Sequence, residues 1–319
     1  MAMLLPDLSS VRTTSKLAAL DAILLLIDGD PGGAVDATIL QFRIADSLNE
    51  YPTLIGNLVQ MACSRLGLQT VEDILRADEV SEADLARLRE ALAARRRANP
   101  LLWGMWSERA LHVEVYDLLA SGETDVGDLY WGSAIPVPPS KLLPEFIIRK
   151  NQIRAVEMMT RLVDAGEDLV AMHEAALQLD TEIPQLSRTY FIVKMMMPSL
   201  SRAVFLQIEH DTVLDCTLVG IAAERFRLAT GRWPASLDEL VPVYLDQVPL
   251  DPFAEGQPLK LVVADRGIII YSIGEDKMDD DGDVVVEEYQ RVGPDLGFRL
   301  LDPEHRGVVI TDEPRPEDE

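Results

Sequence analysis

Apolar residues recur at helical spacing along the first two thirds of the chain. The first stripe consists of four residues at intervals of three and four positions: Leu17, Leu20, Leu24 and Ile27. Such spacing is typical of an amphipathic helix. The turn-forming run 29–33 follows, and helical spacing then resumes with Ile39 and Phe42. The pattern predicts an antiparallel helical hairpin.

Capping signals place further helices after this hairpin. Ser81 with Asp84 predicts the start of a helix that runs to about Ala98, and Asn99-Pro100 ends it and begins the next. The first hairpin resembles one unit of a helical repeat, but Pro52 falls too late for a period of 34 residues. Residues 122–139 are rich in Gly, Asp and Pro, which predicts a loop between two helical groups.

The pattern changes after Pro198. One long helix is predicted from Ser199 to about Thr230, and a capping box at 236–239 predicts a short helix. Three short apolar or β-branched runs predict strands: Leu259–Ala264, Gly267–Ile273 and Val284–Tyr289. The expected fold class is mainly α with a C-terminal α+β module, in which helical hairpins precede a long helix packed on a small antiparallel sheet.

Three regions are expected from this organisation. Residues 1–197 form a helical region of antiparallel hairpins, and residues 198–311 form the α+β module. Residues 312–319 are too polar to pack, and we expect a disordered acidic tail there.

Charge limits the classes of partner. With 54 acidic and 29 basic residues, the net charge is -25, which repels a phosphate backbone and an anionic membrane surface. Nucleic acid is therefore excluded as a partner, and the protein partner is not identified. The apolar run 17–27 contains Asp21 and is too short to span a bilayer, and no signal peptide is recognisable. We expect membrane association only through an anchor that this chain does not contain.

A series of motifs follows the long helix in order. They are Phe226-Arg227-Leu-Ala-Thr-Gly231-Arg232-Trp233-Pro234, Leu237 with Leu240, Tyr244-Leu245, Pro249-Leu-Asp251-Pro252-Phe253, Pro258 and Tyr271-Ser272-Ile-Gly274-Glu-Asp276. Together they resemble the soluble domain of the type II secretion major pseudopilin. The resemblance covers about a quarter of the chain. It implies a head of one helix on a small sheet, which is a structural and not an enzymatic module.

Two departures from that family are visible. No prepilin-peptidase site and no transmembrane helix precede Ser199, so we expect no polymerisation through this helix. Ala254-Glu255 replaces the Gly that follows the Asp-Pro-aromatic unit in the family. The whole chain also resembles uncharacterised bacterial proteins that carry the module, usually behind a membrane anchor. That resemblance implies an extracytoplasmic protein, membrane-tethered in a longer native form; a cytoplasmic location is the alternative.

An acidic loop is the candidate metal site. Five carboxylates fall within eight residues: Asp276, Asp279, Asp280, Asp281 and Asp283. Calcium takes six to eight oxygen ligands from flexible, carboxylate-rich loops, and the resemblance to pseudopilins implies calcium at this loop. The alternative is a solvated turn between strands, because like charges repel unless they are solvated or neutralised.

Two other function classes stay open at this point. His173, His210 and Asp211 are the residue types that a helical metal-dependent hydrolase uses to hold a divalent ion. We expect that they do not converge, and His305 is isolated in the sequence. A helical module that binds peptides in a groove is a further alternative. The resemblance implies a non-enzymatic structural or interaction protein, linked to a cell-envelope or secretion-related assembly and stabilised by calcium.

Overall fold

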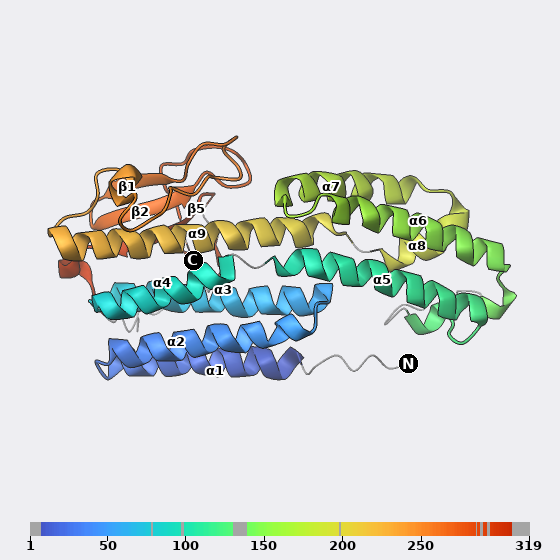
Figure 1. Cartoon of the computed structure of the whole chain (residues 1–319), viewed down its shortest axis with the longest axis horizontal. Helices are drawn as coiled ribbons and strands as arrows, with labels where there is room; N and C mark the ends of the chain where they lie inside the picture. Colours follow the sequence, from blue (N-terminus) through green and yellow to red (C-terminus); the bar gives the residue numbers. More distant parts are fainter. Residues whose placement is uncertain are drawn as a thin grey trace, which may run out of the picture. The chain divides into compact units, whose positions relative to one another are not determined.

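The computed structural model of the chain describes residues 8–77, 79–96, 99–129, 139–197, 199–284, 286–287, 290–291 and 294–307. Helices dominate this part of the chain, and a three-stranded antiparallel sheet lies near its C-terminal end (Figure 1). The predicted fold class, mainly α with a C-terminal α+β module, is therefore confirmed. The predicted tail, 312–319, lies outside the described residues.

Two compact units can be distinguished, and neither is continuous in sequence. The first contains residues 1–47, 62–97 and 210–319, and the second contains residues 48–61 and 98–209. This grouping differs from the predicted division at residue 198. The division at residue 198 remains a prediction.

The first unit begins with the predicted helical hairpin, α1 (Leu8–Ile27) and α2 (Pro31–Asp46). Gly29 adopts a left-handed backbone (φ 76°) that ends α1. Asp30 then caps α2, because its Oδ1 accepts a hydrogen bond from the Gly33 N–H at 2.8 Å. A side chain at Gly33 would overlap the Asp30 carboxylate. Gly29 thus ends the first helix through its backbone conformation, and Asp30 starts the second through its side chain.

The next helices also begin at the predicted caps. In α4 (Glu82–Arg96), the Asp84 N–H donates to Ser81 Oγ at 3.2 Å, and the Ser81 hydroxyl donates to the Asp84 carboxylate. In α5 (Pro100–Ser121), the Leu102 N–H donates to Asn99 Oδ1 at 3.1 Å. Between α2 and α4 lies α3 (Leu54–Ala77).

The described residues of the second unit form helices and the turns between them. Besides α5 it contains α6 (Glu145–Asp164), α7 (Leu169–Gln185) and α8 (Phe191–Met196). Buried Asn151 of α6 donates to the Thr189 carbonyl at 2.8 Å and accepts from the Val193 N–H at 3.2 Å. One amide side chain therefore connects α6 to the segment that forms α8.

The long helix is α9 (Ser201–Thr230), within one or two residues of the predicted bounds. The sheet beside it has the order β1 (Lys260–Ala264), β2 (Gly267–Ser272), β5 (Leu296–Leu301), all antiparallel. Gly220 of α9 lies against the Phe298 ring of β5, where an added Cβ would overlap the ring. A helix packed closely on a small sheet is the arrangement that the sequence predicts.

The third predicted strand is only partly formed among the described residues. Of 284–289, only Val286–Glu287 forms a described strand (β3), which pairs with β4 (Gln290–Arg291) outside the three-stranded sheet; residues 285, 288 and 289 lie outside the described part. The sheet takes β5 instead. Gly297 weakens the strand signal of β5 in sequence, yet it is needed because a side chain there would overlap the backbone of β2.

The predicted capping box at 236–239 is only partly formed. Leu237–Leu240 is a single 3-10 turn, and Ser236 makes no side-chain capping bond. Glu239 Oε1 does accept a hydrogen bond from the Ala235 N–H at 3.0 Å. The acidic half of the box alone therefore fixes this turn.

One hydrophobic core joins the elements of the first unit. It includes buried side chains from α1, α2, α3, α4, α9 and the sheet. In Figure 1 the sheet and the helices α3 and α4 lie on opposite sides of α9. The segment Arg188–Thr230 contains a stretch of 18 residues that is apolar enough to cross a membrane, but 53% of that stretch is buried in the fold. The core helix of a soluble protein has the same length and composition.

Candidate functional site

The acidic loop predicted as a calcium site follows β2 and is exposed on the first unit. All five predicted ligands are exposed residues: Asp276, Asp279, Asp280, Asp281 and Asp283. Asp279 forms an ion pair with Lys260 of β1, and its Oδ1 accepts a hydrogen bond from the Tyr271 hydroxyl at 3.0 Å. The hydrogen bond from Lys260 lowers the pKa of Asp279 below its ordinary value. A lysine therefore already neutralises one of the five carboxylates.

A buried carboxylate outside the acidic run supports this loop. Asp295 is fully buried, and its Oδ2 accepts hydrogen bonds from the N–H groups of Gly282 at 2.9 Å and Asp283 at 3.2 Å. Its other oxygen, Oδ1, is buried without a hydrogen-bond partner among the described residues. Burial raises the pKa of Asp295, although the two backbone N–H groups oppose the rise. An ionised carboxylate oxygen in this position is costly unless a cation or a proton neutralises it.

A second buried carboxylate fixes the start of the loop. Asp251 accepts hydrogen bonds from the Ser272 hydroxyl at 2.7 Å and from the N–H groups of Phe253 at 2.9 Å and Ile273 at 3.0 Å. Both of its oxygens are therefore satisfied. Asp251 holds the end of β2 in place, and Asp295 is the carboxylate with unused ligand capacity.

The side chains of the loop do not converge on one point. Within the described part of the chain, one group of three His, Cys, Asp or Glu side chains has all its ligand atoms within 4.8 Å of one another, and the loop does not supply it. Repulsion between exposed carboxylates favours separated rotamers in the absence of a cation. Calcium binding at this loop would thus require its side chains to turn inward.

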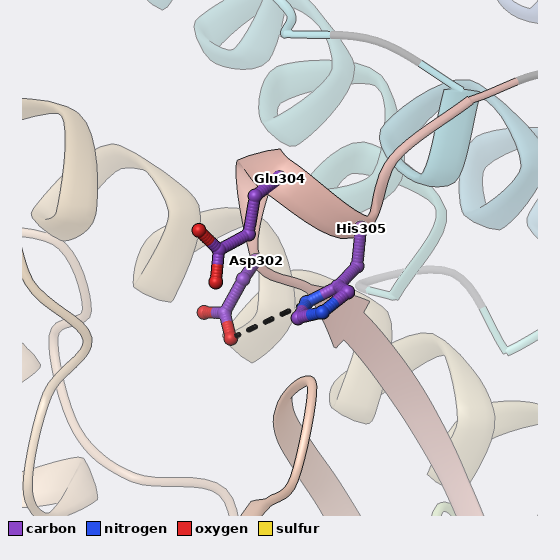
Figure 2. A group of neighbouring side chains, drawn as sticks. All are labelled: Asp302, Glu304 and His305. Carbon is purple, nitrogen blue, oxygen red and sulfur yellow. Dashed lines mark ion pairs between the residues drawn. The ribbon is translucent and has the colours of Figure 1, made fainter.

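The group that does converge is Asp302, Glu304 and His305, at the 3-10 turn after β5 (Figure 2). The ion pair drawn there joins His305 Nδ1 and Asp302 Oδ2 at 3.9 Å. Asp302 Oδ1 also accepts a hydrogen bond from the Trp233 indole N–H at 2.6 Å. The expectation that His305 is isolated is wrong, because this turn places two carboxylates beside it.

The bond to Trp233 indicates a structural function for Asp302. The Asp302 N–H also donates to the Arg266 carbonyl at 2.8 Å, which connects the turn to the β1–β2 hairpin. Glu304 and His305 are exposed. These donor types suit a divalent transition metal, but no buried unsatisfied atom of this group points to a ligand.

The residues of the hydrolase alternative lie in different environments. His210 is buried, with Nε2 at 2.8 Å from Ser64 Oγ and Nδ1 at 3.2 Å from Asp211 Oδ1. Burial lowers the pKa of His210, in spite of Asp211. His173 belongs to the second unit, where its ring packs against Phe205 at 5.6 Å between centroids. No group of three ligating side chains in the described residues includes them.

An arginine lies between the carboxylates nearest to His210. Arg96 Nε donates to Asp215 Oδ1 at 2.8 Å, and Arg96 lies 3.8 Å from Asp211 Oδ2. The guanidinium therefore neutralises the two carboxylates that a metal ion would need. Arg96 thus forms a tertiary ion pair between α4 and α9.

The peptide-binding alternative requires an apolar groove. A surface cavity of about 440 Å³ along α5 is lined in part by acidic side chains: Glu114, Asp117 and Glu123. Asp117 forms an ion pair with Arg149 and accepts a hydrogen bond from Gln152 at 3.0 Å. Apolar side chains line the rest of this cavity in part, but its three carboxylates do not favour a purely apolar peptide helix.

The strongest candidate site is thus the acidic loop together with Asp295, which sequence reasoning missed. Asp295 stands alone after Gly293-Pro294, so no local pattern marks it. Comparison of the chain with family models, with curated proteins and with solved structures finds no match.

Proposed function

We propose that this chain is a non-enzymatic structural or interaction protein whose pseudopilin-like C-terminal module is stabilised by calcium at the acidic loop. The observation that carries the proposal is the fully buried Asp295, whose Oδ1 has no hydrogen-bond partner among the described residues and lies beneath a loop of five exposed carboxylates. Oxygen donors of this kind and number suit calcium.

The residues that would hold the ion are Asp295 and the loop carboxylates, Asp276, Asp279, Asp280, Asp281 and Asp283. Calcium would supply positive charge to a carboxylate that burial makes costly to ionise. It would also offset repulsion within the loop. Its function here would be to fix the loop over the sheet, with no chemical step.

The resemblance to the pseudopilin module supports display or scaffolding outside the cytoplasm, in a cell-envelope or secretion-related assembly. A membrane tether in a longer native protein belongs to the same proposal. The net charge of -25 argues against nucleic acid as a partner. The hydrolase and peptide-binding alternatives are not supported by a comparable observation, since Arg96 occupies the space between Asp211 and Asp215 and the α5 cavity is acidic.

Thermal melts with calcium and with excess chelator test the proposal. At about a hundredfold excess of calcium over its Kd, binding to the folded state alone adds about 2.7 kcal/mol of stability. Asp295→Asn and the double variant Asp276→Asn/Asp281→Asn should abolish the response. Asp265→Asn, which removes an exposed carboxylate from the β1–β2 turn, is the matched control and should keep it.

Magnesium should replace calcium poorly, because it requires a tighter octahedral shell and retains its water. Identical melting curves in calcium and in chelator would leave the loop as a solvated turn and would remove calcium from the proposal. An equal loss of response in Asp265→Asn would show a nonspecific charge effect instead of a site.

A further inference from the structure

Helix α1 has two apolar faces, and the described part of the fold buries only one of them. Small side chains and one leucine form the buried face: Ala18, Ala19, Ala22 and Leu26. The stripe that predicts the helix lies outside the core. Its residues are exposed by 60% (Leu17), 56% (Leu20), 59% (Leu24) and 50% (Ile27). At 3.6 residues per turn, the two sets lie on opposite sides of the helix.

The exposed stripe has the spacing of a coiled-coil seam. Leu17 and Leu24 occupy a positions, and Leu20 and Ile27 occupy d positions, over two heptads. Single exposed leucines are ordinary on protein surfaces. Four aligned large aliphatic side chains form a contiguous apolar strip, which marks an interaction surface.

Charges beside the strip favour a second copy of the chain as its partner. In this register Lys16 is a g residue and Asp21 is an e residue. In a parallel pair of helices, each g residue meets the e residue five positions later on the other helix, so Lys16 of one copy meets Asp21 of the other. An antiparallel pair that keeps the four apolar layers in contact places Asp21 beside Asp21. Neither residue has an ion pair within the described part of its own chain.

We propose that the exposed strip of α1 is a dimerisation face that pairs in parallel with the same face of a second copy. The helix is already formed against α2, so pairing does not have to nucleate it. Two heptads are short for a coiled coil, and self-association should therefore be reversible and dependent on concentration. The proposal does not depend on calcium.

Sedimentation of the full chain from about 1 μM to about 1 mM should show a monomer–dimer equilibrium. Leu20→Glu/Leu24→Glu should sediment as a monomer at all concentrations and keep the wild-type circular dichroism, because both side chains are exposed. Leu177→Glu is the matched control, since Leu177 is a 48% exposed leucine on α7, and it should dimerise like the wild type.

The parallel arrangement has its own test. Lys16→Asp and Asp21→Lys should each weaken the dimer, and the combined swap should restore it. Leu20→Cys should form a disulfide-linked dimer on oxidation, because equivalent d residues face each other in a parallel pair; Cys63 and Cys216 are both buried. A wild-type chain that stays monomeric, a dimer that survives Leu20→Glu/Leu24→Glu, or a swap that fails to restore pairing would each overturn the proposal.

Discussion

Replacing Glu224 with Gln should strongly destabilise the first unit. Glu224 is a fully buried carboxylate on α9 that accepts two hydrogen bonds from Arg306, at 2.9 and 2.8 Å, and two from Arg227, at 2.7 and 3.1 Å. The adjacent Gly307 N–H donates to the Arg76 carbonyl of α3 at 3.2 Å. The carboxylate therefore connects α9 to a segment that also contacts α3.

The expected magnitude follows from burial. The Arg306 side chain is only 3% exposed, so Glu224→Gln leaves a guanidinium away from water with an amide in place of its counterion. Removing one partner of a buried ion pair costs about 3–5 kcal/mol. Glu82→Gln is the control, because Glu82 pairs with Arg225 at 2.6 Å but its side chain is 55% exposed. Such exposed pairs contribute about 0–1 kcal/mol.

Urea unfolding followed by circular dichroism measures both variants. The pH dependence gives a second measure. Burial alone would raise the pKa of Glu224, but the hydrogen bonds from Arg227 and Arg306 outweigh it and lower the pKa. Its contribution to stability is thus complete above the ordinary glutamate pKa and is lost as the pH falls through the lowered value. Glu224→Gln should lose that part of the acid dependence. Equal, sub-kilocalorie costs for Glu224→Gln and Glu82→Gln would refute this reasoning.

Three further predictions concern the same unit. Gly220→Ala should destabilise it by about 1–3 kcal/mol, because the new Cβ overlaps the Phe298 ring, while Gly127→Ala, in open space, should be neutral in thermal melts. Burial lowers the pKa of His210, so the neutral ring stabilises the fold at neutral pH. This stabilisation is lost as the pH falls below about 6.5 and through the lowered pKa. His210→Gln should therefore flatten the pH dependence of the melting temperature. A fragment of residues 198–311 should bind a hydrophobic dye and melt below the full chain, since it lacks the helices that complete its core.

The helices and their ends were predictable because their signals are local. Ser81 and Asn99 form the capping bonds that their sequence contexts predict. Periodicity identifies α1 as a helix, but it cannot show which of two apolar faces is buried. The alanine face is buried because small side chains let α1 approach α2 closely, and this leaves Leu20 and its neighbours exposed.

The candidate site was only partly predictable from sequence, because part of it depends on contacts between distant residues. A run of aspartates is visible in sequence, whereas Asp295 is a single aspartate that reaches the loop through the pairing of β5 with β2. The same holds for Arg96, whose ion pair with Asp215 joins residues 119 positions apart. Such contacts depend on tertiary structure, and no window of sequence contains both partners.

The burial of α9 connects several of these observations. From Thr212 to Phe226 every residue is buried except Leu218 and Arg225, which are half-buried. A helix that is buried on all sides needs apolar residues all around, and for this reason the segment is as apolar as a membrane-spanning helix. The sheet covers one side of it and the N-terminal helices cover the other. Helices α1, α2, α3 and α4 therefore share a core with the C-terminal α+β module, and substitutions in them should destabilise the sheet.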